Sequence, residues 1–447
     1  MRLFHQIMKA LTIVALVSFA VTALAQQPKI QYFRPWDQNG VNTFEPKKQI
    51  EEQPEFDGIK VRIGGAFTQQ YQALSHENNA DVVLGPDGKT NLNELYKLGN
   101  GFNLAMANLN LDVQLEDGIR LSLENYMSSR HHSEFWVKGG YVQVDKLPMF
   151  GNPEWFTKYV RVKLGHFQVN YGDQQFRRTD AGNAMYNPFV GNYIMDAFAT
   201  EIGGEVYIFP TNNLMAMVGV TNGLINGNVT DATRKPSLYA KLAYDNQITE
   251  DFRFRLSGSV YMNEESGRNT LYGGDRAGSR FYEVMESAAS QTDFSGRINP
   301  GFSTNVTTWQ ISPFLKFKGL EVFATYEQAQ GYAGNDPKKE GASTPEKRKV
   351  NQVSVEGIYR FLPREQVYLG ARYNTVSGEM QARTLDAQGN PIDLAVNRYE
   401  IVAGWYATKN LLLKGSYVNQ DYKDFPSTNI FSEGKFNGMM VEAVLAF

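Results

Sequence analysis

The chain has 447 residues, with 44 Lys and Arg against 47 Asp and Glu, and it contains no Cys. The absence of Cys excludes disulfides and thiolate metal sites, and the near-zero net charge argues against a nucleic-acid-binding protein. Aromatic residues make up 13% of the chain, yet its mean hydropathy is −0.40. A barrel with one lipid face and one wet face combines these properties, because it needs many interfacial aromatics and few aliphatic residues.

Residues 1–25 have the pattern of a secretory signal. Arg2 and Lys9 form a positive start, residues 10–23 are apolar and uncharged, and Ala23-Leu24-Ala25 has the small-x-small form of a cleavage site. We expect cleavage between Ala25 and Gln26. A membrane anchor is the alternative, but no later stretch approaches the roughly 18 apolar residues of a spanning helix, so any membrane crossing must use strands.

Residues 26–58 are polar and contain Pro28, Pro35, Pro46 and Pro54. Proline supplies no backbone N–H for a helix or a sheet. We therefore predict an extended periplasmic coil here, acting as a spacer before the first strand.

From Ile59 onward, apolar and polar residues alternate with a period of two, which is typical of strands with two different faces. Counting such segments gives about sixteen, each long enough to cross a bilayer core when tilted. An even number is usual for single-chain outer-membrane barrels. The predicted strands begin near Ile59, Phe102, Ile119, Phe135, Tyr159, Phe198, Asn213, Ser237, Phe252, Asn305, Leu320, Val350, Gln366, Asn397, Leu411 and Phe436.

The connections alternate between long and short along the chain. After the first strand, every second connection is long, with the exception of residues 130–134, and most of the others are tight turns such as Asp117-Gly118. A barrel has short periplasmic turns at one rim and long extracellular loops at the other. The sequence therefore predicts an all-β transmembrane antiparallel barrel of about 16 strands over residues 59–447, with both ends on the periplasmic side.

The chain ends in an apolar alternating stretch that closes on Phe447. This ending is similar to the C-terminal signature of outer-membrane proteins that the barrel-assembly machinery reads. Together with the signal sequence it predicts export past periplasmic chaperones to the bacterial outer membrane, where the partner of the barrel surface is lipid.

Residues 162–207 contain Gly165-His166-Phe167, a Tyr171-Gly172 bend, the pair Arg177-Arg178 and a strand that reopens at Phe198. On these features the mature chain resembles sixteen-stranded porins and, within them, the phosphate-selective-type porin family in the broad sense. The resemblance implies a homotrimer. It also implies that the third outer loop, residues 170–196, folds into the barrel and narrows it.

The residues of that loop fit an inward position. Gly172, Gly182 and Gly191 permit sharp bends, and Tyr and Phe are poor choices for a loop exposed to water. We expect its aromatic side chains to pack on the inner wall, and its charged side chains to face the water path and meet the basic wall. The aromatic residues are Phe176, Tyr186, Phe189 and Tyr193, and the charged residues are Asp173, Arg177, Arg178 and Asp180.

Strand phase predicts which charges face the lumen, because a Lys or Arg facing lipid at mid-bilayer costs about 2–4 kcal/mol. Both signs of charge occur, so basic and acidic residues can face each other across the pore, or they can form ion pairs with neighbours along the wall. The basic residues are Lys60, Arg62, Arg120, Arg161, Lys163, Lys241, Arg253, Arg255, Arg360 and Arg372. The acidic residues are Asp112, Glu124, Glu201, Glu205, Glu327, Glu356, Glu400 and Glu442.

The sequence contains no P-loop, no Rossmann glycine pattern and no His-Glu-x-x-His, and the few His residues do not suggest a catalytic triad. We therefore expect no enzyme activity, no cofactor and no metal. The function predicted is a porin, a water-filled channel for passive diffusion of small hydrophilic solutes and ions. The alternative is a substrate-specific channel for phosphate or other anions, favoured by basic residues, or for oligosaccharides, favoured by aromatic ones.

Overall fold

The computed structural model describes residues 27–48, 53–128, 135–222, 234–273, 276–289, 294–380 and 391–447. The predicted signal sequence and its cleavage site at Ala25 and Gln26 lie outside these residues. No helix in the described part of the chain is long and apolar enough to cross a membrane.

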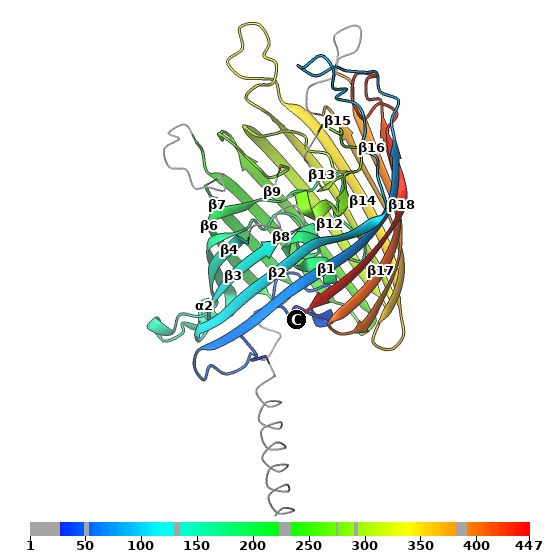
Figure 1. Cartoon of the computed structure of the whole chain (residues 1–447). Helices are drawn as coiled ribbons and strands as arrows, with labels where there is room; N and C mark the ends of the chain where they lie inside the picture. The colour runs from blue at the N-terminus through cyan, green and yellow to red at the C-terminus, as the bar shows by residue number, and fades with distance from the viewer. Residues whose placement is uncertain are drawn as a thin grey trace, which may run out of the picture.

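The described residues form one closed antiparallel barrel of sixteen strands (Figure 1). Each strand begins within three residues of its predicted start. The barrel strands are β1 (Lys60–Glu77), β2 (Gly101–Glu116), β3 (Ile119–Met127), β4 (Trp136–Val144), β5 (Val160–Gln168), β6 (Thr200–Thr211), β7 (Leu214–Thr221), β8 (Ser237–Gln247), β9 (Phe252–Asn263), β12 (Asn305–Phe317), β13 (Leu320–Tyr332), β14 (Arg348–Phe361), β15 (Val367–Gly378), β16 (Leu394–Thr408), β17 (Leu411–Lys423) and β18 (Lys435–Ala446).

Consecutive strands pair in register all around the barrel, and β18 pairs with β1 to close it. Phe447 completes the seam, because its N–H donates to the Gly65 carbonyl (3.1 Å) and its carbonyl accepts from the Gly65 N–H (3.2 Å). The C-terminus therefore lies at the rim of the short turns, as Figure 1 shows. This closure removes the open sheet edge that a bilayer would not tolerate.

Side-chain direction along the strands follows the predicted phase. In β16, Tyr399, Ile401 and Trp405 are exposed on the outer surface, while Arg398 and Glu400, on either side of Tyr399, are buried inside the barrel. Because successive residues of a strand point to opposite faces, this alternation separates an apolar outer surface from a polar lumen.

Short elements lie in the connections and in the N-terminal segment. The helices are η1 (Gln38–Gly40), η3 (Pro148–Phe150), α2 (Glu154–Tyr159), η4 (Gln174–Phe176), η5 (Thr179–Ala181), η6 (Asn183–Met185) and η7 (Arg276–Ser279). The two-residue strands β10 (Phe281–Tyr282) and β11 (Phe294–Ser295) pair with each other outside the barrel sheet.

Candidate pore constriction

The third outer loop, residues 169–199, folds into the lumen as expected. The hydroxyl of Tyr368 on β15 donates to the Pro188 carbonyl (2.9 Å), and that of Tyr406 on β16 donates to the Met185 carbonyl (2.9 Å). The ammonium of Lys414 on β17 donates to three loop carbonyls, those of Ala184, Asn187 and Phe189, at 2.9–3.1 Å. Side chains of the far wall therefore hold the backbone of the loop.

Glycine makes this path possible at its bends. Gly172, Gly182 and Gly191 all have positive φ, at 68°, 77° and 85°. At Gly191 a Cβ atom would lie 2.3 Å from the carbonyl oxygen of Ser279, so a side chain is excluded by contact as well as by conformation. The predicted aromatic packing is also present, since Tyr186, Phe189 and Tyr193 are buried.

The charged side chains of the loop do not face the water path, and that expectation was wrong. Asp173, Arg177, Arg178 and Asp180 are each at most 3% exposed. A charge placed this deep needs a partner and hydrogen bonds to offset its lost hydration, and each of the four pairs with the barrel wall or with another residue of the loop.

Only Asp173 meets the basic wall as predicted. Its carboxylate accepts from Arg255 on β9 (2.8 and 3.0 Å) and pairs with Lys241 on β8 (2.7 Å). Because Arg255 and Lys241 outweigh the effect of burial, they hold the pKa of Asp173 well below its usual range. Arg177 goes to the opposite wall instead, where it pairs with Glu356 on β14.

Arg178 and Asp180 pair with each other within the loop. Arg178 also pairs with Asp196 (2.6 Å), and Asp180 pairs with Lys138 on β4 (2.9 Å). Lys138 was not among the predicted lumen residues. These two loop residues therefore stabilise the fold of the loop and its attachment to β4.

The predicted wall residues lie inside the barrel and pair mainly along the wall. Arg120 donates to Asp112 (3.0 Å), Arg161 to Asp145 (2.8 Å) and Arg253 to Asp245 (2.7 Å). Lys163 lies 3.8 Å from Glu205, which also accepts from the hydroxyls of Tyr207 (2.6 Å) and Tyr239 (2.9 Å). Glu201 accepts from Tyr261 (2.7 Å) and from Thr221.

Another outer loop, between β9 and β12, also packs inside with its described residues 264–273, 276–289 and 294–304, which the sequence did not reveal. The guanidinium of Arg280 donates to the Thr179 carbonyl (2.6 Å), and the N–H of Ile298 donates to the Ile194 carbonyl (2.8 Å). Tyr272, Phe281 and other apolar residues of this loop join residues of the third loop in one buried cluster. The lumen therefore contains a packed core of its own.

The N-terminal segment, residues 28–48, is a coil as predicted but not a spacer. It enters the lumen from the short-turn rim. The Gln31 N–H donates to the side-chain oxygen of Gln114 on β2 (2.9 Å). Asn42 donates to Glu321 on β13 (2.7 Å), a strand that lies far from β2 around the barrel. Phe44 packs edge-on against Phe314 of β12. A spacer would be largely exposed, and this segment crosses the lumen with buried anchors.

The third loop and the N-terminal segment also bind each other. The guanidinium of Arg34 lies over the ring of Tyr186 (3.9 Å to the centroid) and donates to the Phe176 carbonyl (2.9 Å). Tyr186 donates in turn to the Pro35 carbonyl. One clue in the sequence was overlooked: Tyr32, Phe33, Trp36 and Phe44 lie close together in a segment that would be exposed if it were a spacer.

Cavities remain between the N-terminal segment and the walls. One of about 980 Å³ opens at the short-turn rim, with Val41, Asn42, Arg253 and Arg360 in its lining. A second of about 500 Å³ lies between Phe44 and Asp245. A third of about 190 Å³ lies deeper, bounded by Trp36, Glu45, Arg120 and Lys163, among others. Charged side chains of both signs thus line the described lumen.

A closed sixteen-stranded barrel with an apolar outer surface, a charged lumen and an inward third loop has the fold of the outer-membrane porins. Solved structures of outer-membrane proteins have a similar fold. The fold is similar to that of an anion-selective porin from Comamonas acidovorans, with a TM-score of 0.52 and 12% identity over 87% of this chain and 100% of that one.

It is also similar to a trimer form of OmpT, an outer-membrane protein of Vibrio cholerae, with a TM-score of 0.51 and 13% identity over 88% of this chain and 100% of that one. For OprB of Pseudomonas putida the TM-score is 0.51 at 11% identity, over 87% of this chain and 94% of that one. No protein-family model and no curated protein sequence matches the chain. At these identities the likeness concerns the fold.

Proposed function

We propose that the protein is an outer-membrane porin that lets small hydrophilic solutes and ions cross by passive diffusion. The observation that carries this proposal is the lumen, where charged side chains line cavities inside a barrel whose outer surface is apolar. Barrels of about this size leave an aqueous channel unless something narrows them. The proposal requires no catalytic residue, cofactor or metal.

The lining charges favour no single solute. Arg253 and Arg360 at the large cavity are matched by Asp245 and Glu321, at 2.7 and 2.8 Å. Opposed charges of this kind let polar solutes pass and slow apolar ones. A general diffusion channel therefore fits better than one built for phosphate or oligosaccharides.

The proposal places the mature chain in the bacterial outer membrane, after cleavage of residues 1–25 and insertion by the barrel-assembly machinery. It also includes a homotrimer, supported by the trimer form of the OmpT structure.

The test is conductance of the purified protein in planar bilayers, with reversal potentials in a salt gradient. We expect stepwise ohmic currents and weak ion selectivity. Folded protein that inserts without conducting would contradict the proposal, and strong exclusion of cations would support the anion channel instead.

A further inference from the structure

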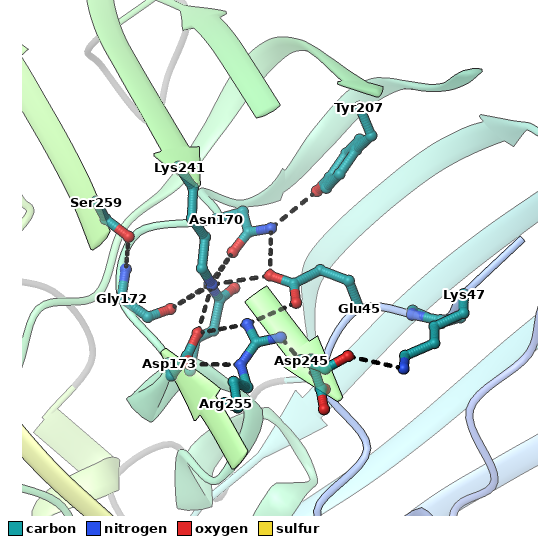
Figure 2. Close-up of polar contacts among 12 residues, drawn as sticks. Glu45, Lys47, Asn170, Gly172, Asp173, Tyr207, Lys241, Asp245, Arg255 and Ser259 are labelled. Carbon is teal, nitrogen blue, oxygen red and sulfur yellow. Dashed lines mark hydrogen bonds and ion pairs between the residues drawn. The ribbon is translucent and has the colours of Figure 1, made fainter. Parts of the chain in front are cut away.

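Four charges meet where the N-terminal segment lies against the third loop, with Asp245 beside them, 3.6 Å from Arg255 (Figure 2). Glu45 of the segment pairs with Lys241 (2.9 Å) on β8 and with Arg255 (2.7 Å) on β9. Asp173 of the third loop pairs with the same two cations, at 2.7 and 2.8 Å. Two acids from different chain segments thus neutralise two adjacent basic residues of the wall.

Glu45 is the only one of these four groups that the N-terminal segment supplies. The other three belong to the barrel wall and to a loop that the wall holds firmly. If the segment left the lumen, Lys241 and Arg255 would lose Glu45 and keep Asp173, with Asp245 3.6 Å from Arg255, and the charge of the group would rise by one. A charge in a narrow, low-dielectric passage acts strongly on passing ions, because field lines concentrate there.

The segment also occupies space along the lumen. It contributes Trp36, Phe44 and Glu45 to the deep cavity, and Val41 and Asn42 to the large one. Its other anchors lie around the barrel. The Gln38 N–H donates to the Lys409 carbonyl (2.8 Å), and the Lys48 ammonium donates to the Asp145 carbonyl (2.6 Å). The segment therefore fills part of the lumen, and the cavities are the space that it leaves open.

We propose that residues 28–48 are a second constriction element of the pore, acting together with the third loop, and that Glu45 determines its charge selectivity. This inference rests on the proposed porin function. Residues 28–48 limit the size of the passage from the short-turn side, and Glu45 offsets the basic wall that would otherwise attract anions.

Three variants test this in planar bilayers. Deleting residues 30–46 should raise the single-channel conductance about twofold or more, because the wide barrel is then narrowed only by its loops. Glu45→Gln keeps the shape and removes the charge, so it should shift the reversal potential toward anions. Glu55→Gln is the matched control, since Glu55 also precedes β1 but is exposed. It should change neither the conductance nor the reversal potential.

The third variant uses the absence of native Cys. In Val41→Cys the thiol faces the large cavity, and a negatively charged methanethiosulfonate reagent should reduce the current. Val353→Cys on the outer surface of β14 is the control. This variant decides the question if the deletion prevents folding.

The inference is overturned if Glu45→Gln leaves the reversal potential unchanged and modified Val41→Cys conducts like the unmodified channel. It is equally overturned if a folded deletion variant conducts like the wild type. A wild-type protein that does not conduct at all would refute the porin function itself, and the inference with it, whereas conducting wild type with unaffected variants refutes the inference alone.

Discussion

Individual charges in this lumen differ in how much water they meet, and this difference separates the predicted pore residues. Arg253 keeps 23% of its side chain exposed and lines the two cavities nearest the short-turn rim. Arg161 keeps only 3%, because it lies under Tyr32 and donates to Asp145 and to the Pro46 carbonyl. The alternation of apolar and polar residues in the sequence places both arginines inside the barrel, but it does not show which residues cover them.

We therefore expect Arg253→Ser to raise conductance and to shift selectivity toward cations more than Arg161→Ser does. Both arginines pair with an Asp, but the side chain of Arg253 is partly exposed beside the cavities and acts on passing ions directly, whereas Arg161 and its partner Asp145 are both buried. Reversal potentials in a tenfold salt gradient measure this. Lys339→Ser, in an exposed outer loop, serves as the control, and equal shifts for the two wall variants would contradict the argument.

The four-charge group also predicts a response to acid. Burial acts to raise the pKa of Glu45, but Arg255 and Lys241 outweigh it and hold the pKa below its ordinary value of 4.5. They have the same effect on Asp173. A carboxylate with a depressed pKa stabilises the packed state above its ordinary pKa, and this stabilisation is lost as the pH falls toward the depressed value.

Near neutral pH we therefore expect a constant reversal potential. As the pH falls well below 4.5, toward the depressed pKa of Glu45, the wall cations Lys241 and Arg255 lose that partner first, and the channel should become more anion-selective. Asp245, which lies 3.6 Å from Arg255, moderates the change. In Glu45→Gln part of this shift should already be present at pH 7, so an acid shift of equal size in wild type and variant would contradict the assignment.

At the scale of elements, the strands were predictable and the contents of the lumen were only partly so. Period-two alternation is a local property that each strand carries by itself, so all sixteen strands could be located. The inward third loop was also anticipated, through Gly172, Gly182, Gly191 and its aromatic residues. Which wall residue a charge of the third loop meets depends on contacts between residues far apart in the chain, such as Arg177 with Glu356, and no local pattern encodes them.

Proline misled the interpretation of the N-terminal segment. Pro28, Pro35 and Pro46 correctly exclude a helix or a central strand, but an extended chain can be buried when side chains and backbone groups around it supply hydrogen bonds. Here Gln31, Asn42 and Lys48 do so. The aromatic residues of the segment were the better signal, because they have little reason to occur in an exposed coil.

The third loop provides a test at this scale. Deleting residues 180–193 removes the carbonyls that Lys414, Tyr368 and Tyr406 bind, so we expect larger conductance together with a less heat-stable barrel. Single-channel recordings measure the conductance. The temperature at which the folded protein changes to the gel migration of the boiled protein measures the heat stability. A deletion variant that migrates as a folded barrel and conducts like the wild type would show that the loop does not limit the passage.

For the whole molecule, the closed barrel predicts how the protein behaves in detergent. It should show β-type circular dichroism, and in gels the unheated sample should migrate differently from the boiled one, because the barrel hydrogen bonds survive detergent until heated. A mainly helical spectrum would contradict the fold.

Phe447 takes part in closing the barrel. Phe447 exchanges two hydrogen bonds with Gly65 on β1, and its aromatic ring ends the apolar face of β18. Deleting Phe447 should reduce the amount of folded protein in the outer membrane and leave unfolded chain in the periplasm. Cell fractionation with heat-shift gels measures this. Unchanged levels of folded protein would show that Phe447 is not an assembly signal.

The position of residues 28–48 also sets an order of events in folding. The segment directly precedes β1, one side of the closing seam, yet its partners lie on β2, β8, β9 and β13. Those partners come together only when most of the wall has formed. We therefore expect this segment to be among the last parts of the chain to reach its native contacts, and a newly closed barrel to pass through a wider stage before the segment packs in its lumen.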